Sequence, residues 1–523
     1  MTVPTSRMPL LLSTGERFLR RHWGLLCAAG LLALALRNFA ALASVPRGFY
    51  QDEAAIGYDG WAIAHYSTDE HGVHLPLFFE SFQDYKNPVY IYAVAAVTRF
   101  LPLTITTARV PAAVFGALAV LLLAATAWKL TRSYTITVVT FLVAGMTPWL
   151  MLESRVAFEV ISLVCAISAA LYCLAAAQSS RPRLHYFLAG CALMVGTFTY
   201  SPARLQIAIF AAVLCAAFGL SQHRRGSWWL ALVPVAAGYA ILFDWSEAHP
   251  GALTGRFQYL SVFNHTNVLF GFGHFVLNYL LYIPSPEFLP LWGDLNWRHN
   301  IHFGGMLLVV TIPLLIIGAK ACLRRFDEPL RRFILVGFLA SPIAAALTGE
   351  GTPHALRAAA MLPFSIALTI YGAEALLART RSPESERRLA TWGTAALLIN
   401  GLGANLWMFT AYPVIAATPF QDGTIAALQA GHKAAGSHTM YITDSAGIEY
   451  SFPLFAFQPP PSVTGGANDV TRLLASVHVV ELPAKATPEL QSGDVLVTAS
   501  SGHVSIPARV IFSTDLLRVY LVS

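Results

Sequence analysis

Long apolar runs alternate with short polar links along most of the chain. A run of about 20 apolar residues is long enough to cross the hydrocarbon core of a bilayer, which is about 30 Å thick. Helices are expected in such runs, because lipid offers no hydrogen-bond partner to an open backbone. The pattern predicts membrane-spanning helices at 22–44, 110–128, 134–152, 157–177, 186–201, 203–220, 228–245, 304–321, 332–348, 356–377 and 389–410.

Two apolar segments do not fit this series of spans. Asn87–Pro102 is short for a crossing, and counting it as one would invert every later link, so we expect a helix at or dipping into the outer interface. The segment 246–303 is rich in aromatic residues and histidine, and His265–Ile283 within it is typical of an interfacial amphipathic helix. The aromatic residues either contact a ligand or form an interfacial belt.

The pattern changes after residue 411. A helical stretch at Thr424–Ala435 precedes short β-type runs, which suggests a small α/β domain with a mixed sheet. We therefore expect a mainly α fold, namely a transmembrane helical bundle of about 11 spans with interfacial helices and a small extracytoplasmic C-terminal domain. The predicted domains are 1–411, with an acidic outer loop at 45–108 and the second outer segment at 246–303, and 412–523. The β-type runs are 438–443, 476–482, 493–499, 508–513 and 516–522.

The composition agrees with a polytopic membrane protein rather than a set of soluble domains. Hydrophobic residues make up 56% of the chain and charged residues only 12%. The net charge is +6, from 34 basic and 28 acidic residues, and its distribution is more informative than its size. Basic residues fall in alternate links, scattered between spans, which argues against a nucleic-acid partner.

This alternation predicts the orientation of the chain. If the N-terminus is cytoplasmic, the opposite short links hold one arginine each, Arg155, Arg204 and Arg357, as the positive-inside rule requires. We therefore expect a multi-pass protein of the plasma (inner) membrane, with a cytoplasmic N-terminus and an extracytoplasmic C-terminal domain. The cytoplasmic links hold Arg17, Arg20, Arg21, Lys129, Arg132, Arg181, Arg183, Arg224, Arg225, Lys320, Arg324, Arg325, Arg331, Arg332, Arg379, Arg381, Arg387 and Arg388.

The six cysteines lie within or at the edge of the predicted spans. None lies in an outer loop, so disulfides are not expected even on an oxidising side of the membrane. We interpret them as small buried apolar residues.

The outer loop after the first span carries an unusual density of carboxylates. Asp52 and Glu53 are adjacent there, and Asp59, Asp69 and Glu70 follow. Neighbouring carboxylates raise each other's pKa, which suits one of them to accept a proton near neutral pH. The alternative is an ordinary solvated loop, but the position at the membrane boundary favours acid–base chemistry.

The next outer turn adds Arg155 and Glu159. An unpaired carboxylate at the edge of a span is energetically unfavourable, so Glu159 is a candidate functional residue. The alternative is a structural ion pair with Arg155.

Other outer turns contribute further cations. Arg204 lies beside Tyr200, Arg357 follows His354, and Lys86 lies in the acidic loop. Several cations near the headgroup level form a natural site for a phosphate at the membrane surface. Snorkelling of single arginines to lipid headgroups is the alternative.

Motifs of other chemistries are absent. The sequence has no phosphate-binding glycine loop with a lysine, no HExxH helix and no Cys/His cluster with zinc spacing. A Gly-x-Ser-x-Gly nucleophile motif is also absent. No metal ligands are assigned from the sequence.

The succession QDEAAIGYDGWAI, YKNPVYIY, ARVPAAVFGALAVLLLAATAWKL and TPWLMLESRVAFE resembles the GT-C superfamily of membrane glycosyltransferases. It looks most like the branch of protein O-mannosyltransferases and lipid A aminoarabinose transferases, which take a sugar from a polyprenyl-phosphate carrier. The likeness covers about the first 200 residues, while the later spans match in layout and the C-terminal domain in placement only.

The resemblance implies a role for three residues. Asp52, with Glu53 beside it, corresponds to the catalytic acid of the first outer loop and is the expected general base. Lys86 stands near the donor phosphate, although Lys-Asn-Pro replaces the family's basic residue followed directly by proline. Glu159 replaces an aspartate found in many relatives, and contacts the acceptor or orients a helix.

The implied reaction is an inverting transfer of a hexose or pentose from the carrier to an extracytoplasmic acceptor, which is a glycan, a lipid or a protein of the cell envelope. Asp52 and Glu53 form the catalytic site, Lys86, Arg204 and Arg357 bind the donor phosphate, and Glu159, Arg155, Tyr200 and His354 form the acceptor or second acidic site. No cofactor is required, and a divalent cation is optional. One alternative is a lipid or sugar transporter or flippase, but such proteins place charges near the bilayer midplane, whereas here the charges cluster at one face. The other alternative is a scaffold that binds glycan without chemistry.

Overall fold

The computed structural model describes residues 14–82, 84–220, 226–264, 266–283, 285–380, 382–461, 470–483, 489–502 and 507–523. Helix accounts for 64% of the chain, and a small β region lies near the C-terminus, which confirms the predicted mainly α fold. Contacts divide the chain into two compact units. The first comprises Met1–Ala40, Val114–Ser154 and Val160–Leu406, and the second comprises Ala41–Ala113, Arg155–Glu159 and Trp407–Ser523.

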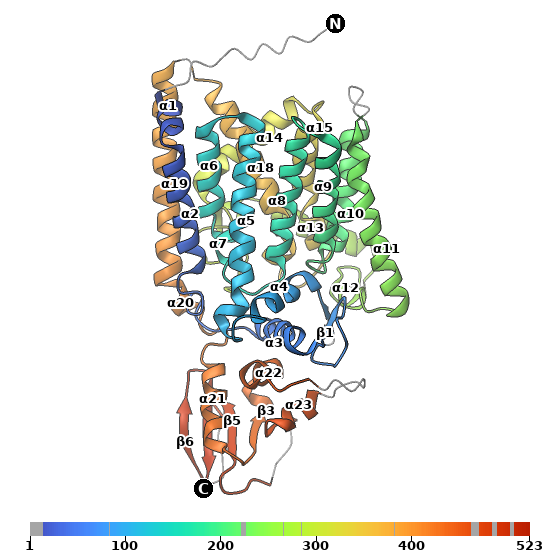
Figure 1. Cartoon of the computed structure of the whole chain (residues 1–523), viewed down its shortest axis with the longest axis vertical. Helices are drawn as coiled ribbons and strands as arrows, with labels where there is room; N and C mark the ends of the chain where they lie inside the picture. The colour runs from blue at the N-terminus through green and yellow to red at the C-terminus, as the bar shows by residue number, and fades with distance from the viewer. Residues whose placement is uncertain are drawn as a thin grey trace. The chain divides into compact units, whose positions relative to one another are not determined.

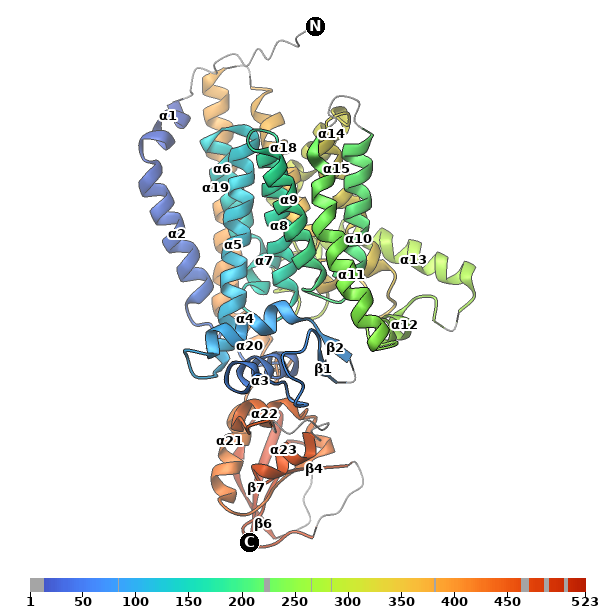
Figure 2. The same cartoon turned by 45° about the vertical axis from the view of Figure 1, so that its right-hand side comes forward.

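The first unit is a bundle of helices. Helices α5, α6, α8, α9, α10, α14, α15 and α18 run along one another (Figure 1, Figure 2). Its elements are α1 (Thr14–Arg21), α2 (Trp23–Phe39), most of α5 (Ile105–Thr131), α6 (Tyr134–Met146), α7 (Pro148–Glu153), α8 (Val160–Ala177), α9 (Pro182–Thr197), α10 (Ala203–Leu214), η1 (Cys215–Gly219), η2 (Ser227–Ala231), α11 (Leu232–Ala248), α12 (Gly255–Leu260), α13 (Val268–Tyr282), η3 (Glu287–Leu291), η4 (Val309–Thr311), α14 (Ile312–Arg324), α15 (Pro329–Ala340), α16 (Ile343–Ala346), α17 (Ala355–Ala358), α18 (Met361–Leu377) and most of α19 (Pro383–Thr410).

Helices α14 and α18 pack unusually closely, and glycine makes this possible. A Cβ atom on Gly318 would lie 1.9 Å from the carbonyl oxygen of Leu368, and one on Gly372 would lie 2.0 Å from that of Leu314. Because each glycine faces the backbone of the other helix, neither position accepts a side chain without separating the pair.

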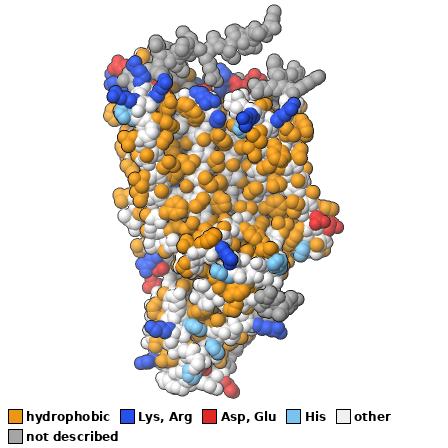
Figure 3. All heavy atoms as spheres, in the orientation of Figure 1, with side chains coloured by type: hydrophobic (Ala, Val, Ile, Leu, Met, Phe, Trp, Pro, Cys, Tyr) orange, Lys and Arg blue, Asp and Glu red, His pale blue; other side chains and the backbone are white. Residues whose placement is uncertain are grey.

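Every predicted span overlaps a helix of the structure, but the count of 11 is not confirmed. Among the described residues, four helices are long and apolar enough to cross a membrane: Ile105–Thr131, Val160–Ala177, Ser227–Ala248 and Pro329–Ala346. Six apolar helices of 10–17 residues accompany them. Figure 3 shows a mainly hydrophobic flank on this bundle and a collection of lysine and arginine side chains at the end where α1, α14 and α15 lie.

Some predictions concern residues outside the described ranges. Arg224, Arg225 and Arg381 of the basic links are among them, and so is His265, the start of the predicted interfacial helix. The described helix of that segment, α13, covers Val268–Tyr282. The short segment before the second span forms α4 (Pro88–Thr98), with proline at its first position.

The second unit combines the acidic loop with the C-terminal residues. Its five-stranded sheet has the order β4-β3-β5-β7-β6, with β3 parallel to β4 and β5 and the remaining pairs antiparallel. The sheet is thus mixed, and its strands coincide with the β-type runs of the sequence. The elements are α3 (Gln51–Tyr66), β1 (Phe79–Ser81), β2 (Asp84–Lys86), α4, the start of α5, α20 (Tyr412–Ile415), α21 (Thr424–Ala435), β3 (Met440–Thr443), η5 (Asp444–Ala446), α22 (Ser451–Phe457), α23 (Val470–Ser476), β4 (Val479–Leu482), β5 (Val495–Ala499), β6 (Ala508–Ser513) and β7 (Leu517–Val522).

One hydrophobic core joins α3 to the C-terminal part of this unit. Tyr58 of α3 is fully buried in the same cluster as Phe455 of α22 and Val497 of β5. The Tyr58 hydroxyl also donates a hydrogen bond of 2.6 Å to the Pro459 carbonyl. The helix that carries the acidic residues is therefore fixed by the C-terminal sheet and its helices. The predicted domain boundary at 411/412 stays a prediction.

Candidate functional site

The acidic pair of the sequence lies in the first turn of α3. Successive residues of an α-helix point about 100° apart, so Asp52 and Glu53 enter different surroundings. The Asp52 side chain is 37% exposed, whereas that of Glu53 is fully buried. Only Asp52 is therefore accessible to an incoming molecule.

Lys86, the last residue of the β1–β2 hairpin, forms an ion pair with Asp52. Its Nζ donates a hydrogen bond of 2.6 Å to Asp52 Oδ1, and its side chain is only 11% exposed. Burial lowers the pKa of Lys86, but the charges of Asp52 and Glu159 more than offset this effect, so its pKa is raised. The protonated, positively charged form of Lys86 is therefore favoured beside the exposed Asp52 carboxylate.

Glu159 is the second carboxylate next to Lys86. The backbone N–H of Asn87 donates a hydrogen bond to it. Burial raises the pKa of Glu159 to about 7, although the Lys86 charge and the Asn87 hydrogen bond act in the opposite direction. Glu159 thus changes its charge near neutral pH, within reach of the Asp52–Lys86 pair.

Glu53 is enclosed by hydrogen bonds. Its carboxylate accepts two bonds of 2.8 Å from Arg109 Nε and Nη2, one of 3.2 Å from the Tyr50 N–H and one of 2.8 Å from the Ala157 N–H. Both oxygens are occupied, and the side chain has no contact with solvent. This differs from the expected catalytic pair, because burial against Arg109 leaves Glu53 no free lone pair directed to a substrate.

Arg155 is also fully buried. Its Nε donates a hydrogen bond of 2.8 Å to the Val45 carbonyl, and its guanidinium lies 4.8 Å from the centre of the Phe409 ring. These contacts join three segments of the second unit that are far apart in the sequence.

A second group of carboxylates lies further along the acidic segment. Asp59 and Glu70 are both fully buried, and Asp59 Oδ1 accepts a hydrogen bond of 3.1 Å from the Glu70 N–H. The Tyr450 hydroxyl donates a bond of 2.7 Å to Glu70 Oε1. Burial and then the Glu70 charge raise the pKa of Asp59 well above its usual value.

The cations predicted on later outer turns belong to the first unit. Arg357 is 8% exposed, and its Nη1 donates bonds of 2.9 Å to Thr348 Oγ1 and to the Glu350 carbonyl. Arg204 Nη1 donates a bond of 3.3 Å to the Leu253 carbonyl. The carbonyl of Tyr200, just before α10, accepts a bond of 2.9 Å from the Ala203 N–H.

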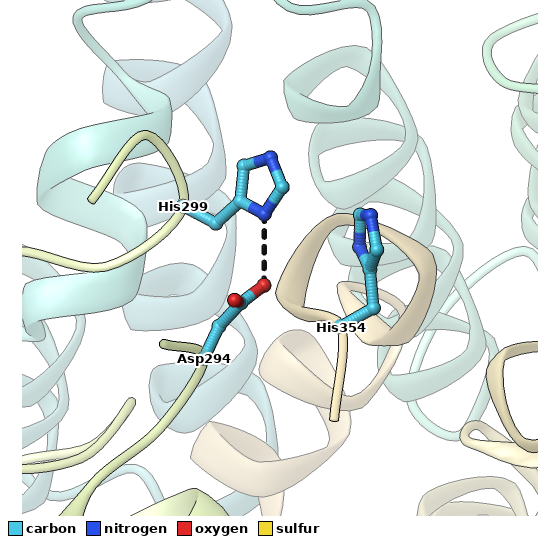
Figure 4. Close-up of side chains that lie close together, drawn as sticks. All are labelled: Asp294, His299 and His354. Carbon is cyan, nitrogen blue, oxygen red and sulfur yellow. Dashed lines mark hydrogen bonds and ion pairs between the residues drawn. The ribbon is translucent and has the colours of Figure 1, made fainter. Parts of the chain in front are cut away.

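His354 precedes Arg357 and caps α17, accepting a bond of 3.5 Å from the Arg357 N–H. Its ring lies 4.7 Å from that of His299, which in turn bonds to Asp294. Figure 4 shows these three side chains together. Burial, followed by the charges of His299 and Arg357, lowers the pKa of His354 well below its usual value, so its imidazole is neutral.

Comparison with solved structures identifies the fold. The structure of ArnT from Cupriavidus metallidurans bound to undecaprenyl phosphate matches with a TM-score of 0.59, covering 95% of this chain and 97% of that one at 12% identity. The chain has the fold of ArnT. The apo form of ArnT matches equally well, with a TM-score of 0.59 at 13% identity over 96% and 98% of the two chains.

Weaker matches add nothing to this conclusion. The oligosaccharyltransferase AglB from Archaeoglobus fulgidus matches with a TM-score of 0.48 at 12% identity, over 92% of this chain and 70% of that one. No protein-family model matches the sequence, and no curated protein matches it either. The GT-C resemblance is thus confirmed as a likeness of fold, through ArnT.

Within this ArnT fold, the structure brings some of the predicted residues together. Asp52, Lys86 and Glu159 meet in the second unit. Arg204 and Arg357 belong to the first, so their approach to Lys86 stays a prediction.

Two other features were missed at the sequence level. Arg109 directly precedes a predicted span, and an ionisable residue at that position indicates a buried partner or a functional role. Asp294 and His299 join His354 from more than 50 positions away, so no local spacing reveals them.

Proposed function

We propose that this chain is a membrane glycosyltransferase that moves a sugar from a polyprenyl-phosphate carrier to an extracytoplasmic acceptor. The observation that carries the proposal is the exposed Asp52 carboxylate held by a buried lysine, in a chain with the fold of ArnT. The solved form of ArnT holds undecaprenyl phosphate, a lipid carrier of the proposed class.

In the proposed reaction, Asp52 takes the proton of an acceptor hydroxyl. The hydroxyl oxygen attacks the anomeric carbon, and the bond from that carbon to the phosphate oxygen breaks with inversion. The polyprenyl phosphate leaves with the bonding electron pair. Lys86, with Arg204 and Arg357, stabilises the charge that grows on the phosphate.

Lys86 links donor binding to base strength. While it donates to Asp52, it lowers the basicity of that carboxylate. A donor phosphate competes for the same ammonium group, and its arrival draws Lys86 away from Asp52. Asp52 then becomes a stronger base when a donor is present.

Two further residues support this pair. Glu159 tunes the charge around Lys86, because it lies beside it and titrates near pH 7. Glu53 and Arg109 fix the start of α3, which carries Asp52, to the segment before it and to α5. Glu53 is thus a positioning residue in this proposal.

The proposed location is the plasma membrane, with the N-terminus cytoplasmic and the acidic loop outside. Cysteines introduced at His74 and Glu384, both exposed, test this orientation. An impermeant thiol reagent should label the His74→Cys variant in intact cells and the Glu384→Cys variant only after lysis, with wild-type protein as the control for native cysteines. Labelling of Glu384→Cys from outside would overturn the orientation.

The function is tested with purified protein and two classes of donor. Transfer of label from a polyprenyl-phosphate sugar to envelope extract is the expected result, and transfer from a nucleotide sugar alone should be absent. Label that moves only from the nucleotide sugar would refute the carrier hypothesis. Identification of the labelled product then defines the sugar and the acceptor.

A further inference from the structure

We propose that Asp294, His299 and His354 bind a zinc-class divalent metal ion. The three residues come from two segments of the first unit, the loop before η4 and the turn before α17. One ligand atom from each lies within 4.8 Å of the other two. Figure 4 shows Asp294 and His299 directed toward each other, with the His354 ring beside them.

The spacing is close to that of a metal site. Ligand atoms of a tetrahedral zinc ion lie about 3.3 Å apart, as bond lengths of about 2.0–2.1 Å require. His299 Nδ1 and Asp294 Oδ2 are already 2.8 Å apart, with a proton between them. An ion that replaces this proton has to draw the His354 nitrogen closer, because the three ligand atoms are spread over as much as 4.8 Å.

Hydrogen bonds hold Asp294 and its loop in place. The Asn296 N–H donates a bond of 2.8 Å to Asp294 Oδ1, and the Ala355 N–H donates one of 2.8 Å to Asp294 Oδ2. Asn300 Nδ2 donates to the carbonyl of Trp292, at 2.8 Å. Such supporting bonds hold ligands in place and are typical of metal sites in proteins.

Burial favours a bound cation. Asp294 is 4% exposed and His299 is 6% exposed. An ionised carboxylate in this position needs a compensating charge. The guanidinium of Arg357, the nearest arginine in the sequence to His354, is directed to Thr348 and Glu350 instead. A metal ion bound here adds positive charge directly at the carboxylate, beside the contributions of His299 and of the nearby Arg298.

The donor atoms select the metal. Two imidazoles with one carboxylate suit zinc, with a water molecule as fourth ligand. Magnesium and calcium prefer oxygen ligands throughout and do not suit this set. The bound ion is expected to cross-link the loop before η4 to the start of α17. The rival interpretation is a hydrogen-bonded Asp294–His299 pair with His354 as a neutral neighbour.

Metal content of the full chain tests the proposal. Protein purified in detergent through a tag without histidines, then loaded with zinc and dialysed, should retain about one zinc ion per chain. His299→Ala and His354→Ala should each lower zinc affinity about 100-fold or more, measured against a competing chelator. His302→Ala is the matched control, because His302 lies in the same loop but packs on Trp297, with 4.1 Å between the two ring centres.

Cobalt substitution keeps the test independent of variant folding. Metal-free wild-type protein titrated with Co²⁺ should develop visible absorption of a tetrahedral nitrogen–oxygen site, which added zinc removes. Wild-type protein that binds neither metal overturns the proposal. Zinc retained by both ligand variants, or a thiolate absorption band, which would indicate a cysteine site, overturns it as well. None of these readouts depends on sugar transfer, so they stand apart from the proposed function.

Discussion

Substituting Arg109 with methionine removes the cation at the centre of the second unit. Its five N–H donors are all used: two on Glu53, and one each on the carbonyls of Leu42, Pro46 and Gly48, at 2.7–3.1 Å. Methionine has a similar length and no polar donor. The substitution therefore leaves Glu53 ionised and buried, with only two backbone N–H groups as partners.

The expected loss follows from this geometry. Breaking a buried ion pair by removal of one partner costs about 3–5 kcal/mol, because the remaining charge is left without compensation. Arg109→Met should therefore lower the free energy of unfolding by about 3–5 kcal/mol. In the double variant Glu53→Gln with Arg109→Met, neither charge remains. Its loss should be smaller than the sum of the two single losses by about 2 kcal/mol.

Unfolding in mixed detergent micelles measures these differences, and Arg99→Met is the matched control. Arg99 is exposed and donates one bond of 3.1 Å to the Ala64 carbonyl, so its replacement should change stability by less than about 0.5 kcal/mol. An Arg109→Met protein as stable as the Arg99→Met protein would refute the reasoning. Strict additivity in the double variant would also refute it.

Three further changes test the region around Asp52. Lys86→Met should raise the donor KM about 10–100-fold through loss of a charge-assisted bond, while Lys433→Met, on the exposed face of α21, should leave it unchanged. Glu159 gains its negative charge as pH rises through about 7, and this charge attracts Lys86 and repels the donor phosphate. The donor KM of the wild-type protein should therefore rise above that pH. Glu159→Gln should flatten the dependence of donor KM on pH, and an unchanged dependence would contradict this role. Tyr450→Phe removes the 2.7 Å bond to buried Glu70 and should cost about 1–3 kcal/mol of stability in a denaturation experiment, whereas a loss near zero would contradict the assigned bond.

The arrangement of helices and strands could be predicted largely from hydrophobic patterning. The run Ala508–Ser513 is a strand with the same bounds as predicted, and Thr424–Ala435 is a helix with the same bounds. Both depend on local preference, which a window of sequence contains. The number of spans is less accessible, because apolar helices such as Val268–Tyr282 are shorter than a full crossing.

The site was only partly accessible from the sequence. The density of carboxylates directed attention to Asp52, and the structure supplies its partner Lys86. The role expected of Glu53 followed from adjacency alone, and adjacency in a helix does not mean a shared environment. Its partner Arg109 comes from another helix, 56 positions away, and only the folded chain shows such a contact.

The central claim is that Asp52 accepts the proton, and one pair of variants tests it most directly. Asp52→Asn removes the base and keeps the shape, while Asp59→Asn makes the same change two turns further along α3. Asp59 is buried, with a pKa raised well above its usual value, and its Oδ1 accepts the Glu70 N–H, a bond that asparagine keeps. We expect Asp52→Asn to lower sugar transfer from the polyprenyl-phosphate donor by about 10²–10⁴-fold, with folded protein in the membrane and full activity in Asp59→Asn. Transfer by Asp52→Asn at the wild-type rate would contradict the account.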